Sequence, residues 1–206
     1  MTCHTVFFPR WQSIASGANK TFPGISATNS PVRKVPRTFR VSIASDLAGA
    51  FAGQSVEYLF IGKSGAIILG YPGTTMDVDV FPEKNPDNGR KIVAALRSLG
   101  FDINETLEAE IVAGRDFVQL KNGPFDVDLV FAPDGIESFE KARTRRIVYE
   151  NLPVAALEDI ISSKRASGRE KDLIDLPLLE DFQREYERLH PRPLKSAWEI
   201  NRDEMK

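Results

Sequence analysis

Cysteine and histidine are almost missing from this chain of 206 residues, and their scarcity excludes several kinds of site. The only cysteine, Cys3, excludes a disulfide framework, and one cysteine with two histidines is too few for a typical zinc site. The histidines, His4 and His190, lie close to the two ends of the chain. Catalysis by a thiol nucleophile or by a histidine base is therefore not expected.

Long apolar runs are also missing, since no stretch approaches the roughly 20 apolar residues that a membrane-spanning helix needs. We therefore expect a soluble, cytoplasmic protein without membrane contact. Acidic residues are absent from the first 45 positions, which hold six basic residues. The rest of the chain holds 21 basic and 29 acidic residues, a balance that disfavours nonspecific binding of nucleic acid.

The two ends of the chain are predicted to be irregular, which leaves one folded domain. Residues 1–44 are rich in Ser, Thr, Pro and Gly, carry only basic charge, and are interpreted as a disordered arm. A transit peptide, or translation from an upstream start, would account for the same composition. We expect the folded domain over residues 45–189 and an irregular tail over 190–206.

Hydrophobic periodicity and turn residues predict the α/β (α+β) class, with a mixed β-sheet flanked by helices and a C-terminal helical pair. Ser45 is the predicted N-cap of the first helix, and Asn85 that of a helix ending before Gly100. Pro177 is expected to kink or restart the last helix. The expected helices cover 45–53, 63–70, 85–100, 135–145, 156–167 and 170–189, and the expected strands cover 56–62, 75–81, 116–120, 125–131 and 147–154.

Two aspartates, Asp77 and Asp79, interrupt an otherwise apolar strand. Side chains two apart in a strand share a face, so these carboxylates point the same way, while Met76, Val78 and Val80 are expected to pack on the other side. Each carboxylate raises the pKa of the other unless a cation lies between them. Such oxygen ligands suit Mg²⁺ or Mn²⁺, although a lone D-x-D motif on an edge strand can also simply face water.

A second acidic pair, Asp126 and Asp128, lies in the expected strand over residues 125–131. A carboxylate on a neighbouring strand would complete a site for two metal ions about 4 Å apart, which hold the attacking and leaving oxygens of a displacement. The two acidic strands together therefore favour a metal site over a solvent-facing edge.

The sequence FIGKSG places Gly62, Lys63 and Ser64 at a predicted strand-to-helix turn. Such a turn offers bare backbone N–H groups and the positive end of a helix to phosphate groups. Glycine also occurs at these turns for geometry alone, so the turn by itself is a weak indication.

Lys164 continues the apolar face of the helix predicted over residues 156–167. A lysine on an inward face must either extend to solvent or meet an anion. Arg169 and Lys171 follow shortly after it. A solvated basic helix end, favoured by the helix dipole, is the alternative interpretation of these three residues.

Together, the segments IGKSGAIILGYPGTTMDVDVF, DVDLV and LEDIISSKRASGREKDLIDLPLL resemble the nucleotidyltransferase fold of the DNA polymerase β superfamily. The resemblance covers about residues 45–185 and is closest to the minimal, AbiEii-type nucleotidyltransferases of type IV toxin–antitoxin systems. The joint order of glycine turn, D-x-D, third aspartate and basic helix motif is far more specific than any one part.

The resemblance implies a role for each matching position. Asp128 best matches the family's third carboxylate, Asp126 is the alternative, and Asp172 would orient a basic neighbour. The implied catalytic and metal-binding residues are Asp77, Asp79 and Asp128, and the implied nucleotide-binding residues are Gly62, Lys63, Ser64, Lys164, Arg169 and Lys171.

Three positions depart from the family pattern. Relatives usually have glycine or serine where Lys63 stands, often have arginine where Gly73 stands, and often have histidine where Leu69 stands. These departures concern turnover rather than the fold, because a lysine in the turn could either contact a phosphate or block its approach.

These features predict a Mg²⁺-dependent nucleotidyltransferase that moves a nucleoside monophosphate from an NTP to an acceptor hydroxyl and releases pyrophosphate. A tRNA end, a protein and a small molecule all remain open as the acceptor. The alternative is a catalytically weak nucleotide-binding member of a toxin–antitoxin-like module, with a cognate antitoxin protein as its partner. A metal-dependent glycosyltransferase is less favoured, because it would leave the basic helix motif without a role.

Overall fold

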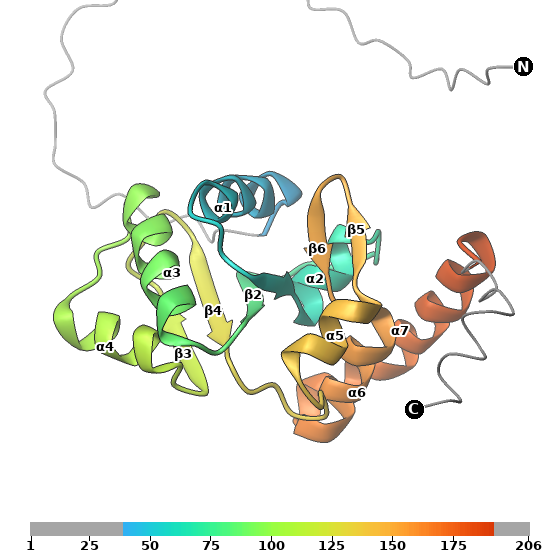
Figure 1. Ribbon diagram of the computed structural model, residues 1–206. Coiled ribbons are helices and arrows are strands. Elements are labelled where there is room, and N and C mark those ends of the chain that lie inside the picture. The colour runs from blue at the N-terminus through green and yellow to red at the C-terminus, as the bar shows by residue number, and fades with distance from the viewer. Residues whose placement is uncertain (1–38, 192–206) are drawn as a thin grey trace, which may run out of the picture. The chain divides into compact units, whose positions relative to one another are not determined.

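The computed structural model describes residues 39–191, and Figure 1 shows how these residues are arranged. The strands are β1 Tyr58–Phe60, β2 Asp77–Pro82, β3 Phe117–Leu120, β4 Asp126–Val130, β5 Ile147–Tyr149 and β6 Leu152–Val154. The helices of this range are α1 Val41–Gly53, α2 Gly62–Ile68, α3 Pro86–Ser98, α4 Glu105–Ala113, α5 Phe139–Arg145, α6 Leu157–Ser167 and α7 Glu170–Leu189.

The strands form one six-stranded sheet in the order β3-β4-β2-β1-β6-β5. β2 runs parallel to β4 and antiparallel to β1, while β1 runs parallel to β6. The sheet is therefore mixed, and α6 packs against both α2 and α7. This arrangement confirms the predicted α/β architecture with its C-terminal helical pair.

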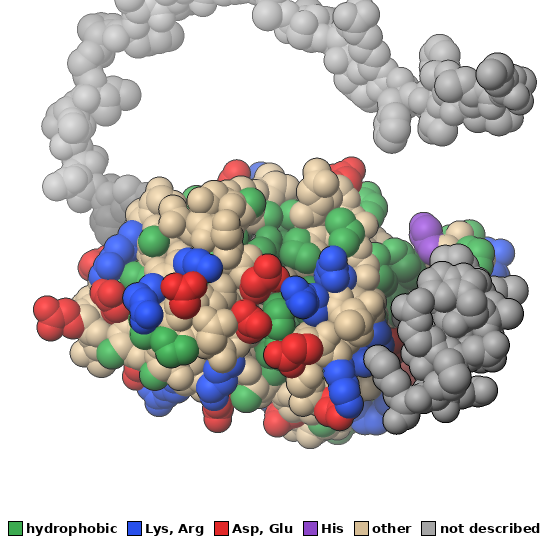
Figure 2. All heavy atoms as spheres, viewed as in Figure 1, with side chains coloured by type: hydrophobic (Ala, Val, Ile, Leu, Met, Phe, Trp, Pro, Cys, Tyr) green, Lys and Arg blue, Asp and Glu red, His purple; other side chains and the backbone are tan. Residues whose placement is uncertain are grey.

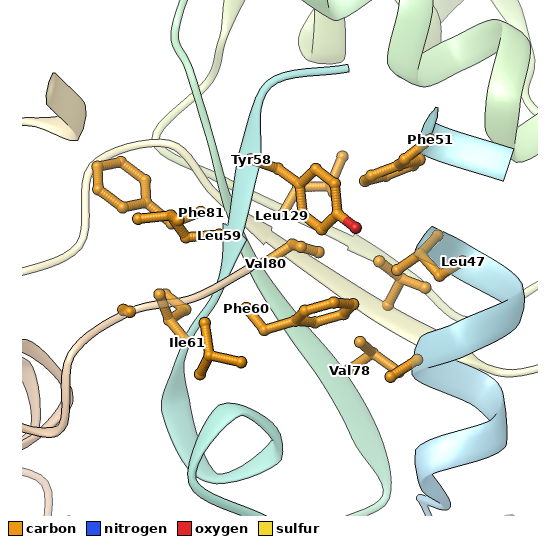
Figure 3. Packing of buried hydrophobic residues seen from close by; sticks show 14 of the residues in the cluster. Leu47, Phe51, Tyr58, Leu59, Phe60, Ile61, Val78, Val80, Phe81 and Leu129 are labelled. Carbon is orange, nitrogen blue, oxygen red and sulfur yellow. The ribbon is translucent and has the colours of Figure 1, made fainter. Parts of the chain in front are cut away.

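One face of the sheet carries core side chains that lie toward α1. Tyr58 and Phe60 of β1 and Val78 of β2 are buried, and in Figure 3 they lie toward Leu47 and Phe51 of α1. The rings of Phe51 and Tyr58 meet edge to face with centroids 4.8 Å apart. Because side chains alternate along a strand, burial of this face directs the aspartates of β2 to the opposite face.

Local sequence signals set the ends of α3 as predicted. The Asn85 side chain accepts a hydrogen bond from the Asn88 N–H and so caps α3, while Pro86 occupies the first turn. Gly100, with a φ of 90°, follows the end of the same helix. α7 runs through Pro177 as one helix, so the predicted restart does not occur.

The predicted helix start at Ser45 is wrong by four residues, because α1 begins at Val41 after an extended Arg40. The Ser45 hydroxyl donates to the Val41 carbonyl inside the helix instead of capping its end. Phe39 is buried, and its N–H donates to the carbonyl of Thr75 at 2.8 Å. Tertiary contacts therefore hold this helix start, which has no side-chain cap that a sequence pattern could reveal.

The sequence pattern also misses one helix and one strand. α4 is capped by Asn104 and ends at Gly114, whose φ is 64°. The segment predicted as one extended piece is a hairpin of β5 and β6, joined by Glu150 and Asn151 with φ values of 47° and 68°. Both residues adopt the left-handed region without being glycine, so the turn lacks its usual sequence signal.

Residues 1–38 of the predicted arm over 1–44 and residues 192–206 of the predicted tail over 190–206 lie outside the described residues. Between residues 39 and 191, every helix is too short or too polar to cross a membrane.

Candidate active site

Three carboxylates from two neighbouring strands converge on one point of the sheet. Asp79 of β2 lies directly beside Asp128 of β4 in the parallel ladder, and Asp77 lies two residues earlier on the same face. Carboxylate oxygens of all three residues lie within 4.8 Å of one another. The structure therefore brings together the three aspartates that the sequence resemblance selected.

Two residues next to this cluster, Asp126 and Met76, do not take the places that the sequence left open or predicted for them. Asp126 pairs with Asp77 in the ladder but does not belong to the group of three, so the alternative third carboxylate is not favoured. Met76 was expected to pack in the core, yet its side chain is 48% exposed. Met76 precedes the first residue of β2, so strand alternation does not govern its direction.

Each carboxylate of the cluster is held by a neutral side chain. The bonds are Thr75 Oγ1 to Asp77 at 2.6 Å, Ser64 Oγ to Asp79 at 3.3 Å, and Gln119 Nε2 to Asp128 at 3.0 Å. Sequence reasoning missed Thr75 and Gln119. The hairpin between β3 and β4 places Gln119 directly opposite Asp128, so the strand register was the signal that could have found it.

Burial and repulsion between neighbouring carboxylates disfavour the charged forms of Asp79 and Asp128. Burial, with Asp77 and Asp128 close by, raises the pKa of Asp79 to about 7. Burial also raises the pKa of Asp128, against the opposing effect of the Gln119 hydrogen bond. Within residues 39–191 none of the three carboxylates takes part in an ion pair. A cluster of this kind suits a divalent cation bound by carboxylate oxygens.

The glycine turn packs directly against the cluster. Gly62 has a φ of 61°, and a Cβ atom at this position would lie 2.5 Å from Oδ2 of Asp79. Ser64 is fully buried, and its hydroxyl accepts a hydrogen bond from the Asp79 N–H at 2.9 Å. The Ser64 hydroxyl therefore positions Asp79, and any phosphate contact at this residue would have to come from the backbone.

Lys164 meets an anion inside the protein, which is one of the two outcomes expected for it. Its buried Nζ lies 2.7 Å from Oδ1 of Asp172 and 3.7 Å from Oδ2 of Asp175. Asp172 also accepts hydrogen bonds from Ser167 at 2.9 Å and Arg169 at 2.5 Å. Burial alone would raise the pKa of Asp172, but these bonds outweigh it and lower the pKa to about 2. Asp172 orients its basic neighbours, as predicted.

Lys63 points from the glycine turn toward α7. Its Nζ lies 3.0 Å from Oδ2 of Asp175, a residue that sequence reasoning did not single out. A Cβ atom on Gly73 would lie 3.3 Å from Cε of Lys63 and 2.9 Å from the Tyr71 ring. The two departures from the family pattern, at positions 63 and 73, therefore adjoin in space, because the missing side chain at Gly73 leaves room for the lysine.

One cleft of about 790 Å³ contains these groups. Of the predicted site residues, Ser64 alone does not line it. Seven aspartates and four basic side chains contribute to the walls. The acidic residues are Asp77, Asp79, Asp116, Asp128, Asp134, Asp172 and Asp175, and the basic residues are Lys63, Lys164, Arg169 and Lys171.

No protein-family model and no curated protein sequence matches this chain. A solved structure described as the lincosamide antibiotic adenylyltransferase LnuA with lincomycin bound is similar, with 16% identity and a TM-score of 0.44, over 68% of this chain and 94% of LnuA. A second, described as a candidate nucleotidyltransferase (TM1012) from Thermotoga maritima, shows 13% identity and a TM-score of 0.39, over 74% of this chain and 93% of that one. Both neighbours are thus described as nucleotidyltransferases.

Proposed function

We propose that this protein is a Mg²⁺- or Mn²⁺-dependent nucleotidyltransferase, which transfers a nucleoside monophosphate from an NTP to an acceptor hydroxyl and releases pyrophosphate. The observation that carries the proposal is the convergence of Asp77, Asp79 and Asp128 in a cleft that four basic side chains also line. Acidic metal ligands beside phosphate-binding cations are the groups that phosphoryl transfer requires.

The chemistry of the donor set fits a divalent cation. Three carboxylates lie within reach of one another, burial and repulsion disfavour the charged forms of Asp79 and Asp128, and neutral side chains fix their positions. Asp77, Asp79 and Asp128 would hold the metal, which when bound would stabilise negative charge on the attacking and leaving oxygens.

The remaining side chains would bind and orient the nucleotide. Lys63, Lys164 and Arg169 would face the phosphates, and the backbone of the turn at Gly62 would approach them closely. Because acidic residues outnumber basic ones in the cleft, an NTP without a divalent cation would be repelled. Nucleotide binding should therefore be lost in EDTA, and isothermal titration calorimetry can measure that loss.

Replacement of the third carboxylate gives a test with a matched control. Asp128→Asn should lower the transfer rate by at least about 10²-fold, because a ligand of the charge-stabilising site is lost. Asp126→Asn changes a neighbour on the same strand and should keep most of the activity. The measurement is transfer of label from each α-³²P-labelled NTP to a total cell extract, with thermal melts to verify folding. Equal effects of both substitutions would contradict this assignment.

The double variant Asp77→Ala/Asp79→Ala provides a second test of the same site. It should abolish transfer while the metal-free protein stays folded or becomes more stable, because two mutually repelling carboxylates are removed. Circular dichroism during heating measures the stability. A marked drop in melting temperature in EDTA would instead mean that the aspartates hold the fold together.

A second candidate function is a nucleotide-binding member of a two-protein module of the AbiEii toxin–antitoxin type. The Lys63–Asp175 ion pair favours this candidate, because it occupies the lysine of the turn with an internal anion. Its signature would be divalent-dependent NTP binding without pyrophosphate release. A pyrophosphate-release assay with cell extract as the acceptor source separates the two candidates.

A further inference from the structure

The two sides of the cleft differ in chemistry. Lys63 belongs to α2, which follows β1, and Lys164 belongs to α6, which packs against α2. β1 adjoins β2 on the side away from β4, whereas β3 adjoins β4 on the other side. The sheet order therefore places the basic residues and the residues of β3 on opposite sides of the three carboxylates.

On the β3 side the cleft is lined by apolar residues, which we name the apolar wall: Phe117, Val130, Ala132 and Pro133. Phe117 is 51% exposed although it belongs to a strand whose other face is buried. It shares its exposed face with Gln119, which holds Asp128 at 3.0 Å. A phenyl ring left open beside the cluster is a surface that a ligand can cover.

In-line displacement connects this wall with the acceptor. At the α-phosphorus the attacking oxygen and the leaving oxygen lie roughly opposite each other. With pyrophosphate leaving along the basic side, the acceptor hydroxyl must approach from the side of Asp128 and Phe117. We propose, on the basis of the proposed function, that the apolar wall binds the acceptor, and that the acceptor is a small alcohol or phenol with a flat apolar group and no phosphate.

The reaction balances with this acceptor alone. Its hydroxyl oxygen forms a bond to the α-phosphorus and loses its proton to a neighbouring carboxylate or to water. The bond between the α-phosphorus and the oxygen that bridges to the β-phosphorus breaks. The products are the nucleoside monophosphate ester of the acceptor and pyrophosphate.

The charges around the apolar wall select against a nucleic-acid acceptor. Asp116 and Asp134 flank the wall, and Lys84, at a neighbouring cleft, already pairs with Asp116 at 2.9 Å. On the face that Figure 2 shows, acidic and basic side chains are interspersed over the described residues. Binding of a tRNA backbone relies on a continuous basic surface, whereas a neutral or cationic small molecule does not.

A second cleft shares two residues with the apolar wall. It has a volume of about 370 Å³, and Ala132 and Pro133 line both clefts. Its remaining lining combines three glutamates, one lysine, Asn85 and Ser138 with the apolar residues Phe81, Phe131, Ile136 and Phe139. An acceptor on Phe117 could therefore extend its apolar part past Pro133, and this volume suits a small molecule rather than a folded macromolecule.

The test uses the full chain with Mg²⁺, an α-³²P-labelled NTP and a panel of defined acceptors. The panel contains tyramine, 4-methylbenzyl alcohol, 4-hydroxyphenylacetate and deacylated tRNA. We expect label on tyramine or on the benzyl alcohol, with less on the anionic phenol and none on tRNA. Saturation-transfer NMR with the same compounds and a non-hydrolysable NTP analogue reports binding without turnover.

Phe117→Ala should raise the KM for the acceptor by about tenfold and leave the KM for the NTP unchanged, because only the acceptor contacts the ring. Phe117→Trp should retain the activity. The matched control is Tyr149→Ala, which removes a 43% exposed aromatic side chain from β5, the strand at the opposite edge of the sheet. This control should leave both KM values unchanged.

Four results would overturn the proposal: label on tRNA alone, no binding of any apolar compound, equal effects of Phe117→Ala and Tyr149→Ala, or an NTP KM that rises in Phe117→Ala. The last would mean that the nucleobase covers the ring. Failure of the proposed function itself is distinguishable, because the wild-type protein would then neither bind the Mg²⁺–NTP complex nor release pyrophosphate with cell extract.

Discussion

The ammonium group of Lys63 lies 3.0 Å from the carboxylate of Asp175, which joins the start of α2 to α7 across the cleft. The same carboxylate lies 3.7 Å from Lys164, so it faces two cations assigned to the nucleotide phosphates. Asp175 is 20% exposed and Lys63 is 28% exposed, which leaves both accessible to a ligand. A bound triphosphate would thus compete with Asp175 for Lys63.

Asp175→Asn is therefore expected to tighten binding of the Mg²⁺–NTP complex by roughly two- to fivefold, because a partly exposed ion pair contributes up to about 1 kcal/mol. Calorimetric titration measures the affinity. Asp181→Asn, which removes another acidic residue of α7, is the control. In a Lys63→Ala background the gain should shrink, and weaker binding by Asp175→Asn would show that Asp175 positions the lysine instead.

Gly62 and Gly168 form a matched pair, since both have a φ of 61°. Alanine at either position should cost about 1–2 kcal/mol of unfolding free energy, because L-residues resist this conformation. A Cβ atom on Gly62 would lie 2.5 Å from Asp79, whereas nothing lies within 4 Å of one on Gly168. Only Gly62→Ala should therefore weaken Mn²⁺ binding, which electron paramagnetic resonance detects. Equal Mn²⁺ affinities in the two variants would contradict the predicted role of Asp79.

The raised pKa of Asp79, about 7, predicts a pH dependence of stability without metal. The folded protein holds this proton more tightly than the unfolded chain, so the resulting stabilisation is full below about pH 4 and is lost as the pH rises through 7. The unfolding free energy in EDTA should therefore fall between about pH 5 and about pH 8, and Asp79→Asn should reduce that fall. Urea melts at both pH values measure it, and parallel profiles would contradict the assignment.

Cation binding should follow the opposite trend, because protons and metal ions compete for the same carboxylates. The Mn²⁺ affinity of the wild-type protein is expected to rise from about pH 5 to about pH 8 as Asp79 loses its proton. A flat affinity over this range would mean that Asp79 is not a ligand.

Substitution of Lys164 should lower the free energy of unfolding as well as the affinity for NTP, because the lysine is buried in an ion pair. Lys164→Met removes a buried cation from Asp172 and leaves that carboxylate paired with the exposed Arg169, so we expect a loss of about 3 kcal/mol in unfolding free energy together with weaker NTP binding. The double variant Lys164→Met/Asp172→Leu should recover much of the stability, because neither charge remains buried. It should still bind NTP weakly, and recovery of binding would remove Lys164 from the nucleotide site.

The face of β2 and the N-cap of α3 were predictable because they depend on local spacing. Alternation alone placed Asp77 and Asp79 side by side, and Asn85 with Pro86 marked the start of α3. Helical period placed Lys164 on an inward face. By contrast, α1 begins before Ser45 because long-range contacts hold its start, and no local signal records such contacts.

The amino-acid sequence by itself determined which residues could carry charge into the site and on which face of each element they stand. Only the tertiary structure decided that Asp128, and not Asp126, completes the acidic cluster, and that Asp175 reaches Lys63 from 112 residues away in the chain. Periodicity acts over a few residues, whereas the pairing of strands and the docking of helices depend on burial of the whole core. The partners of each charged group are therefore set when the sheet assembles.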